Sequence, residues 1–453
     1  MRRVVKVSRI RIIITIIVVV LTTLLTGCTG KEPNEIAYVV ALGIDSTDDD
    51  NYKITIQYAN TTQISGGASE SGGKAGSEIV DNVTIEAPNI YAGVGLANNI
   101  VSKSFSMSHA KLIVFSKEIA EKGVKDMIET LVRSEEIRPD VFIAVANTTA
   151  NDYLTSVNPE MEVNPAQYYQ LIYQKNQLVG IPDGQLREFF TGLYTDNYDS
   201  ILPVAGVIEG AGGNSQNDDK GQSKDSQNEG SEGSSESLDS FESKNSDENE
   251  KEKDAEKNTS KYEYDIKNYV GGETAIEKKN KAEAIGAAVF EKDKMVGELG
   301  EVETEICKML KGDYTYSYLT YYNNDTPDIP ITVKTTQQKK PKYKIDTDKK
   351  TVDIELYIES DLYSLPADYN VENKIEDFER DVANYTSSTC TKFINNFTKK
   401  YNSDILKLNE KVKYKFLTNN QYNWFKKNVG WSEYKFSVCT NFKVRRTGLI
   451  VRE

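Results

Sequence analysis

Residues 112–147 read LIVFSKEIAEKGVKDMIETLVRSEEIRPDVFIAVAN, and the alternation within them predicts how the first half of the chain folds. The apolar runs at 112–115 and 141–147 have the length of buried strands, whereas 117–134 places apolar side chains at helical spacing. The spaced side chains are Ile119, Val124, Ile128 and Leu131. Strand, helix and strand in succession indicate crossover connections on a sheet covered by helices.

The sequence on either side extends this sheet. An apolar run at 36–44 and an alternating run at 52–58 predict a hairpin. Further strands are expected at 83–86 and 201–208. Helices are expected from Asn89 to about residue 102, at 168–173 and at 185–194. The N-terminal part therefore predicts a mixed sheet with helices.

The second half has a different pattern. Residues 287–290 and 295–299 flank a polar turn and predict a hairpin, and 351–359 alternates as a one-sided antiparallel strand. Apolar residues spaced by threes and fours from 371 to 408 predict one long amphipathic helix or two in succession. A last alternating strand is expected at 434–446. The chain is thus predicted to be multi-domain α+β, with a mostly antiparallel sheet and a long amphipathic helix in the C-terminal part.

The N-terminus predicts a lipoprotein signal. Arg2, Arg3, Lys6, Arg9 and Arg11 precede an apolar stretch at 12–25 and the tetrapeptide Leu25-Thr26-Gly27-Cys28. The apolar stretch is shorter than the roughly 20 residues that span a bilayer. We expect cleavage between Gly27 and Cys28, which makes 1–27 a signal peptide, and diacylglyceryl modification of Cys28, the first residue of a lipidated stalk at 28–35. An ordinary signal peptide or an uncleaved anchor are the alternatives.

Charge and composition set the remaining boundaries. Residues 211–260 hold 14 Asp and Glu against 6 Lys in a run of Gly, Ser, Asn and Gln, which predicts a disordered acidic linker. The linker separates an N-terminal domain at 36–210, formed as one unit or as two subdomains, from a C-terminal domain at 261–453. The net charge of −14 makes nucleic acid an unsuitable partner.

No constellation of residues predicts a catalytic or metal site. The sequence lacks the common hydrolase, nucleotide and zinc motifs, and no cofactor is expected. His109, the single histidine, is expected to play a structural role at the start of a buried strand. The cluster Asp45, Asp48, Asp49 and Asp50 is expected to form a solvated turn, because it lacks the spacing of a calcium loop. Cys307, Cys390 and Cys439 predict free thiols, with Cys439 accessible, and Trp424 and Trp431 predict core anchors.

Several short sequence motifs, taken in their order along the chain, resemble those of the Ger(x)C-type spore germination lipoproteins. Ala41-Leu42-Gly43-Ile44-Asp45 is similar to the family's opening strand, and Ser108-His109-Ala110-Lys111-Leu112-Ile113-Val114 to its histidine-bearing strand. Residues 131–138 are similar to its arginine-containing helix end, and 286–290 with 295–299 to its hairpin. Residues 401–405, Trp431 and 444–448 complete the resemblance. Thr29-Gly30-Lys31, Leu406-Lys407-Leu408 and the acidic insert depart from the family pattern.

The resemblance implies the C subunit of a nutrient germinant receptor. Such a subunit would be non-enzymatic, anchored at the outer face of the spore inner membrane through a diacylglyceryl group on Cys28, and assembled with two integral membrane partner subunits. It implies no ligand-binding residue. The alternative hypothesis is a solute-binding lipoprotein of a transporter, which would predict two similar α/β lobes around a cleft.

Overall fold

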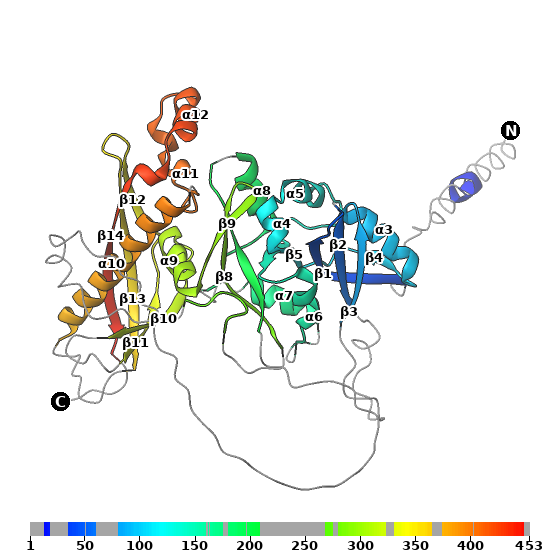
Figure 1. Ribbon diagram of the computed structural model, residues 1–453, viewed down its shortest axis with the longest axis horizontal. Coiled ribbons are helices and arrows are strands. Elements are labelled where there is room, and N and C mark those ends of the chain that lie inside the picture. The colour runs from blue at the N-terminus through cyan, green and yellow to red at the C-terminus, as the bar shows by residue number, and fades with distance from the viewer. Residues whose placement is uncertain are drawn as a thin grey trace, which may run out of the picture.

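The computed structural model shows two sheets joined through a shared hairpin and flanked by helices (Figure 1). The structure describes residues 13–18, 35–49, 51–59, 80–159, 162, 164–174, 180–195, 197–208, 268–274, 280–322, 330–364, 374–401 and 403–447. The predicted signal cleavage site, the stalk up to residue 34 and the acidic linker lie outside the described residues.

The first sheet has nine strands in the order β3-β2-β1-β5-β6-β7-β8-β9, with β4 paired to β1. Its strands are β1 (Ile36–Ser46), β2 (Tyr52–Ala59), β3 (Val80–Ala87), β4 (Ser104–Ser106), β5 (Leu112–Ser116), β6 (Phe142–Ala146), β7 (Ile201–Val207), β8 (Ala282–Glu291) and β9 (Lys294–Leu299). The central strands β1, β5, β6 and β7 run parallel, and both ends of the sheet are antiparallel. The predicted mixed sheet and its crossover connections are confirmed.

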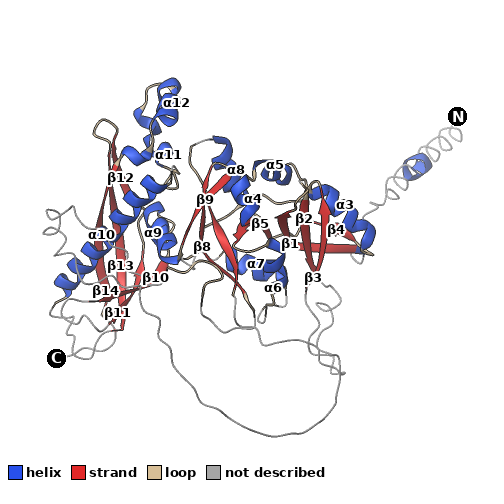
Figure 2. Ribbon diagram, in the orientation of Figure 1, coloured by secondary structure: helices blue, strands red, loops and turns tan. Residues whose placement is uncertain are grey.

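Helices cover both faces of this sheet because its central strands are apolar on both faces (Figure 2). In β5, Ile113 and Phe115 face one core, while Leu112 and Val114 face the other. The first core is closed by α3 (Ile90–Ile100), α4 (Lys117–Lys122), α5 (Lys125–Val132) and α8 (Leu186–Thr195). The second is closed by α6 (Ala150–Ser156) and α7 (Pro165–Tyr173).

The prediction of one helix over 117–134 is wrong in one respect, because this segment forms two helices that are separated at Gly123. Gly123 has a φ of 123°, which a residue with a side chain rarely adopts. The break brings the next amide into the turn between β8 and β9, where the Val124 amide donates to the Asp293 carbonyl at 3.0 Å. The four apolar residues that predicted one helix are all buried, which explains why their spacing gave no sign of the break.

Asp45 corrects the expectation of a solvated turn, because this carboxylate is buried at the end of β1. Its two oxygens accept the amides of Ala150 at 2.6 Å and Asn151 at 3.0 Å, at the start of α6. Burial raises the pKa of Asp45, and these two amides offset part of the rise. Asp48 and Asp49 are exposed, as expected for a turn.

We expect Asp45→Ala to lower the free energy of unfolding by about 1–3 kcal/mol, because two buried amides lose their acceptor. Chemical denaturation followed by circular dichroism measures the change. Asp48→Ala is the matched control and should leave the midpoint unchanged. Equal stability of the two variants would show that the cap contributes nothing.

The second sheet has five strands in the order β10-β11-β13-β12, with β14 paired to β13. Its strands are β10 (Tyr316–Tyr322), β11 (Pro330–Thr336), β12 (Lys342–Asp346), β13 (Thr351–Ser364) and β14 (Lys435–Arg446). All pairs are antiparallel except β13 with β14, so the mostly antiparallel sheet is confirmed. The helices of this half are α9 (Glu301–Lys311), α10 (Ile375–Lys400), α11 (Leu408–Val412) and α12 (Asn419–Asn428), with 3-10 turns η2 (Lys413–Lys415) and η3 (Trp431–Glu433).

The long amphipathic helix is α10, with 26 residues. Its buried side, which includes Phe378, Val382, Cys390, Phe393 and Phe397, packs on the second sheet. The helix ends at Tyr401, where the backbone turns extended, so Ile405 and Leu408 belong to a separate buried segment.

The β8–β9 hairpin belongs to the first sheet although it follows the acidic segment in sequence. Ala288 and Phe290 face the core of the first sheet, whereas Ala287 and Val289 face the core under α9 and α10. One strand therefore contributes to both cores, because its alternate side chains point to opposite sides. The change from the first sheet to the second falls at α9, and the domain bounds given above stay a prediction.

Candidate functional site

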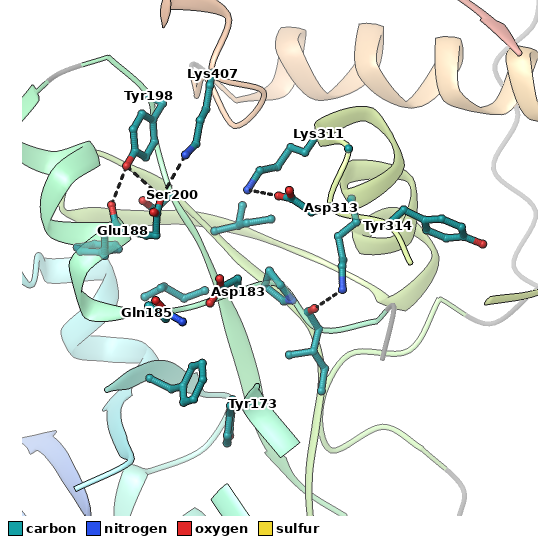
Figure 3. Close-up of a pocket in the computed structure, with 18 of the residues that line it drawn as sticks. Tyr173, Asp183, Gln185, Glu188, Tyr198, Ser200, Lys311, Asp313, Tyr314 and Lys407 are labelled. Atoms are coloured by element: carbon teal, nitrogen blue, oxygen red, sulfur yellow. Dashed lines mark hydrogen bonds and ion pairs between the residues drawn. The ribbon is translucent and has the colours of Figure 1, made fainter. Parts of the chain in front are cut away.

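A cavity of about 490 Å³ lies where the two halves meet, and we call it the junction cavity (Figure 3). Its walls come from α8 and β7, from the loop at 180–185, from the end of α9 and from Lys407. Its lining is predominantly polar and carries charges of both signs. Acidic side chains come from the N-terminal half and lysines from the C-terminal half, apart from Asp313 beside Lys311.

One side of the cavity holds Glu188, Tyr198 and Lys407. Lys407 donates to a Glu188 carboxylate oxygen at 3.1 Å, and its ammonium lies 4.1 Å from the centre of the Tyr198 ring. The Tyr198 hydroxyl donates to the Glu188 carbonyl at 3.0 Å. Burial raises the pKa of Glu188, but the hydrogen bond and the charge of Lys407 outweigh it, so this pKa lies below its usual value. Glu188 is therefore an ionised partner of Lys407 rather than a proton donor.

The opposite side is built from α9. Lys308 is buried and donates to the Ile181 carbonyl at 3.0 Å, while Lys311 lies 3.4 Å from Asp313 (Figure 3). Burial lowers the pKa of Lys308 and raises the pKa of Asp183 across the cavity. Lys308 thus ties the end of α9 to the loop of the first half, whereas the Lys311–Asp313 pair lies within the second half.

Next to the cavity, a short segment pins the end of α10 to the β8–β9 hairpin. The Ser403 hydroxyl donates to the Phe290 carbonyl at 2.8 Å, and the Asp404 amide donates to Asp199 at 2.8 Å. The Asp404 carboxylate accepts the amides of Leu408 and Asn409, both at 2.8 Å. Tyr401 lies against Gly297, where a side chain on the glycine would overlap the tyrosine ring.

The described residues that line the junction cavity include no histidine and no cysteine. His109 is exposed in the turn before β5, which corrects its expected place inside the strand, and its ring contacts Ser108 and Tyr38 rather than the cavity. Burial raises the pKa of Cys307 and of Cys390 to about 12, so both stay protonated thiols. Among the described residues, no group of three or more His, Cys, Asp or Glu is placed to hold a metal ion.

The sequence did not reveal the junction cavity, because its charged residues are scattered over more than two hundred positions. Lys308 stands among apolar neighbours on α9, and only the packed structure shows that it reaches Ile181. The expected lipidation site Cys28 and its neighbour Gly27 lie outside the described residues. Of the two tryptophans, Trp431 is a core residue as expected, whereas Trp424 is 64% exposed and corrects that expectation. Cys439 is exposed, as predicted.

Comparison with known proteins identifies the family. The model described as the spore germination protein N-terminal domain matches residues 30–207, and the model described as spore germination B3/GerAC-like, C-terminal, matches 285–448. The chain belongs to the GerAC-type family of spore germination C subunits. The order of the two matches is the order of the two halves of the structure.

Relatives within this family are distant. The chain is 26% identical over 174 residues to spore germination protein KC of Bacillus subtilis (strain 168), which is 35% of this chain and 42% of that protein. It is 26% identical over 148 residues to spore germination protein B3 of the same organism, or 30% of this chain and 36% of that protein. The matched stretches thus span less than half the length of either relative. The crystal structure of the GerBC protein aligns with 89% of this chain and 96% of that chain, with 15% identity and a TM-score of 0.48.

Three of the GerAC-type motifs, at 286–290, 295–299 and 401–405, lie where the two halves contact each other. Gly286 has a φ of 84°, and its amide donates to the Gly180 carbonyl at 2.7 Å beside the cavity. Gly297 makes room for Tyr401, and Ser403 and Asp404 bind the hairpin and Asp199. These three motifs therefore supply close backbone approaches and hydrogen bonds between the halves.

Proposed function

We propose that this chain is a lipid-anchored, non-enzymatic subunit of a spore nutrient germinant receptor. In this proposal it is held at the outer face of the spore inner membrane and assembles with two integral membrane partner subunits. The observation that carries the proposal is the pair of family matches, which together include both halves of the structure in order. The anchor rests on Leu25-Thr26-Gly27-Cys28, which follows a basic and then an apolar stretch.

The architecture favours this proposal over a solute-binding lipoprotein. Such a protein would have two similar α/β lobes, whereas here a nine-stranded mixed sheet is joined to a five-stranded, mostly antiparallel one. In the junction cavity, Lys407 pairs with Glu188 and Lys308 donates to the Ile181 carbonyl, and both contacts join the two halves, which supports a role in fixing them. Within the described part of the chain, no helix is long and apolar enough to cross a bilayer.

The role in germination is tested by deleting the gene and following the loss of optical density of spores after nutrients are added. Spores without the gene should fail to respond to at least one nutrient combination, and the wild-type gene should restore the response. A normal response to every combination, in a strain without paralogous receptor genes, would contradict the proposal. Two membrane-protein genes in the same operon would support the partners.

The anchor is tested by Cys28→Ala. We expect this variant to incorporate no labelled fatty acid and to leave the membrane fraction, because stable anchoring needs the two acyl chains that a diacylglyceryl group supplies. Cys439→Ala is the matched control, since it removes an exposed thiol elsewhere and should be labelled normally. Full labelling of Cys28→Ala would refute the anchor and leave the germination role to the deletion experiment.

A further inference from the structure

A basic and aromatic tip stands out from the second half of the molecule, and we call it the α12 tip, residues 407–428. Figure 1 shows α12 projecting beyond both sheets at the end of the molecule where α10 ends. The tip holds six lysines against one carboxylate, Glu410, a net charge of +5 on a chain whose net charge is −14. The lysines are Lys407, Lys411, Lys413, Lys415, Lys426 and Lys427.

The large apolar side chains of the tip form two sets, one packed inward and one exposed. Phe416, Tyr422 and Phe425 pack inward, with the Phe416 ring 5.0 Å from that of Phe425. Tyr414, Leu417 and Trp424 point outward and are 79%, 94% and 64% exposed. Phe416, Tyr422 and Phe425 already form the packed side of the tip. The exposure of Tyr414, Leu417 and Trp424 is therefore not the result of an incomplete core.

The tip is held firmly to the body. The Trp431 indole donates to Asn409 at 3.2 Å, and the Tyr422 hydroxyl donates to the Asn409 carbonyl and to Asn197, both at 3.1 Å. Lys426 also donates to Asn197 at 3.1 Å. The exposed aromatic side chains are therefore presented on a fixed platform rather than on a loose loop.

The positive charge of the tip is compensated only in part, since Lys411 lies near Asp404 and Glu410, and Lys415 near Asp346. Among the residues the structure describes, Lys407 is the one lysine of the six in an ion pair, with Glu188. Lys411 and Lys415 donate to carbonyls, and Lys413 lies over the Tyr422 ring at 5.8 Å. None of these neutral partners cancels a charge, and α12 itself contains no acidic residue.

We propose that the α12 tip binds the surface of an anionic lipid bilayer, with Trp424, Leu417 and Tyr414 at the level of the headgroups. Trp and Tyr favour the membrane interface because their rings are apolar with a polar edge. Each lysine near an anionic surface contributes about 1 kcal/mol of attraction, which falls off with salt. The charge complementarity selects an anionic bilayer over a zwitterionic one. This contact is independent of Cys28 and would hold the second half of the molecule near the membrane.

The test uses the full lipidated chain in vesicles and the fluorescence of its two tryptophans. In vesicles that contain phosphatidylglycerol, lipids brominated on the acyl chain should quench the emission of Trp424 and leave the buried Trp431 as an internal reference. We expect the emission to fall about twofold, since one of the two tryptophans is quenched, and to recover in high salt. Vesicles of phosphatidylcholine alone should show no quenching.

Two variants test whether the quenching arises at the α12 tip or elsewhere in the chain. Trp424→Phe should abolish the quenching, and Lys413→Glu with Lys427→Glu should remove most of it. Lys125→Glu with Lys340→Glu is the matched control, because it reverses two exposed charges away from the tip and should quench like the wild type. Circular dichroism should be unchanged in all of these variants, since the altered side chains are exposed.

Equal emission in anionic and zwitterionic vesicles, with no effect of brominated lipid, would overturn the proposal. So would shielding of Trp424 only when membrane partner proteins are reconstituted with the chain, because that result would assign the tip to a protein interface. Quenching that persists in Trp424→Phe would place the lipid contact elsewhere.

Discussion

Gly206→Ala is expected to destabilise the protein by about 3 kcal/mol or more, a large share of the roughly 5–15 kcal/mol that stabilises a typical domain. Gly206 lies on β7, and the backbone of Gly271 and Gly272 passes directly over it. A Cβ on Gly206 would overlap the main chain of both glycines. A flexible side chain could move aside, but here the overlapped atoms are backbone.

The backbone over Gly206 cannot retreat without losing hydrogen bonds. The Gly271 amide donates to the Ile285 carbonyl at 2.9 Å, and Asn147 donates to the Gly271 carbonyl at 2.5 Å. The Gly272 amide donates to the buried Glu283 carboxylate at 2.5 Å. Moving this segment would therefore break its hydrogen bonds to β8 and to Asn147, which follows β6.

Urea denaturation of Gly206→Ala, compared with wild type, measures the loss. Gly95→Ala is the control, because a Cβ there meets no atom within 4 Å and alanine favours the helix by up to about 1 kcal/mol. Wild-type stability in Gly206→Ala would contradict the close approach.

The second large effect is an unusual dependence of stability on pH. Burial raises the pKa of Asp404 to about 7, against the offsetting amides of Leu408 and Asn409, and Asp199 nearby raises it further. Burial also raises the pKa of Glu305 to about 7. In the unfolded chain both carboxyls regain ordinary values near pH 4.

The free energy of unfolding falls as the pH rises, because the folded and unfolded states bind different numbers of protons. Between about pH 4 and pH 7 the folded protein holds protons that the unfolded chain has released, so raising the pH through this window favours unfolding. The contribution of these two groups to stability is full below the unfolded pKa and is lost as the pH rises to about 7. We expect the free energy of unfolding to fall by about 2–3 kcal/mol for each group over this window.

Urea denaturation at a series of pH values from 4 to 8 tests this expectation, since it gives the slope of the free energy of unfolding against pH for each variant. Asp404→Asn should flatten the pH dependence relative to wild type, because the amide cannot titrate. Asp348→Asn, at an exposed turn, should keep the wild-type slope. A wild-type slope in Asp404→Asn would show that this carboxyl is ionised throughout.

Gly206 and Asp404 both lie close to the junction between the two halves. Gly206 and Gly271 pack β7 against the segment that leads into the hairpin, and Asp404 ties the end of α10 to the same hairpin through Asp199.

The sequence by itself determined the fold class, the mixed and the antiparallel sheets, and the family. The fold class and the sheets rest on local periodicity, which the apolar runs at 112–115 and 141–147 and the alternation at 351–359 display without reference to the rest of the chain, whereas the family rests on the resemblance of short motifs. It could not determine the break at Gly123, the buried cap formed by Asp45 or the place of Trp424. The break and the cap depend on partners distant in sequence, Asp293 and the start of α6, and the place of Trp424 depends on which side of α12 packs inward through Phe425. The junction cavity was decided by tertiary structure alone, because Glu188 and Lys407 become neighbours only after the hairpin joins both cores.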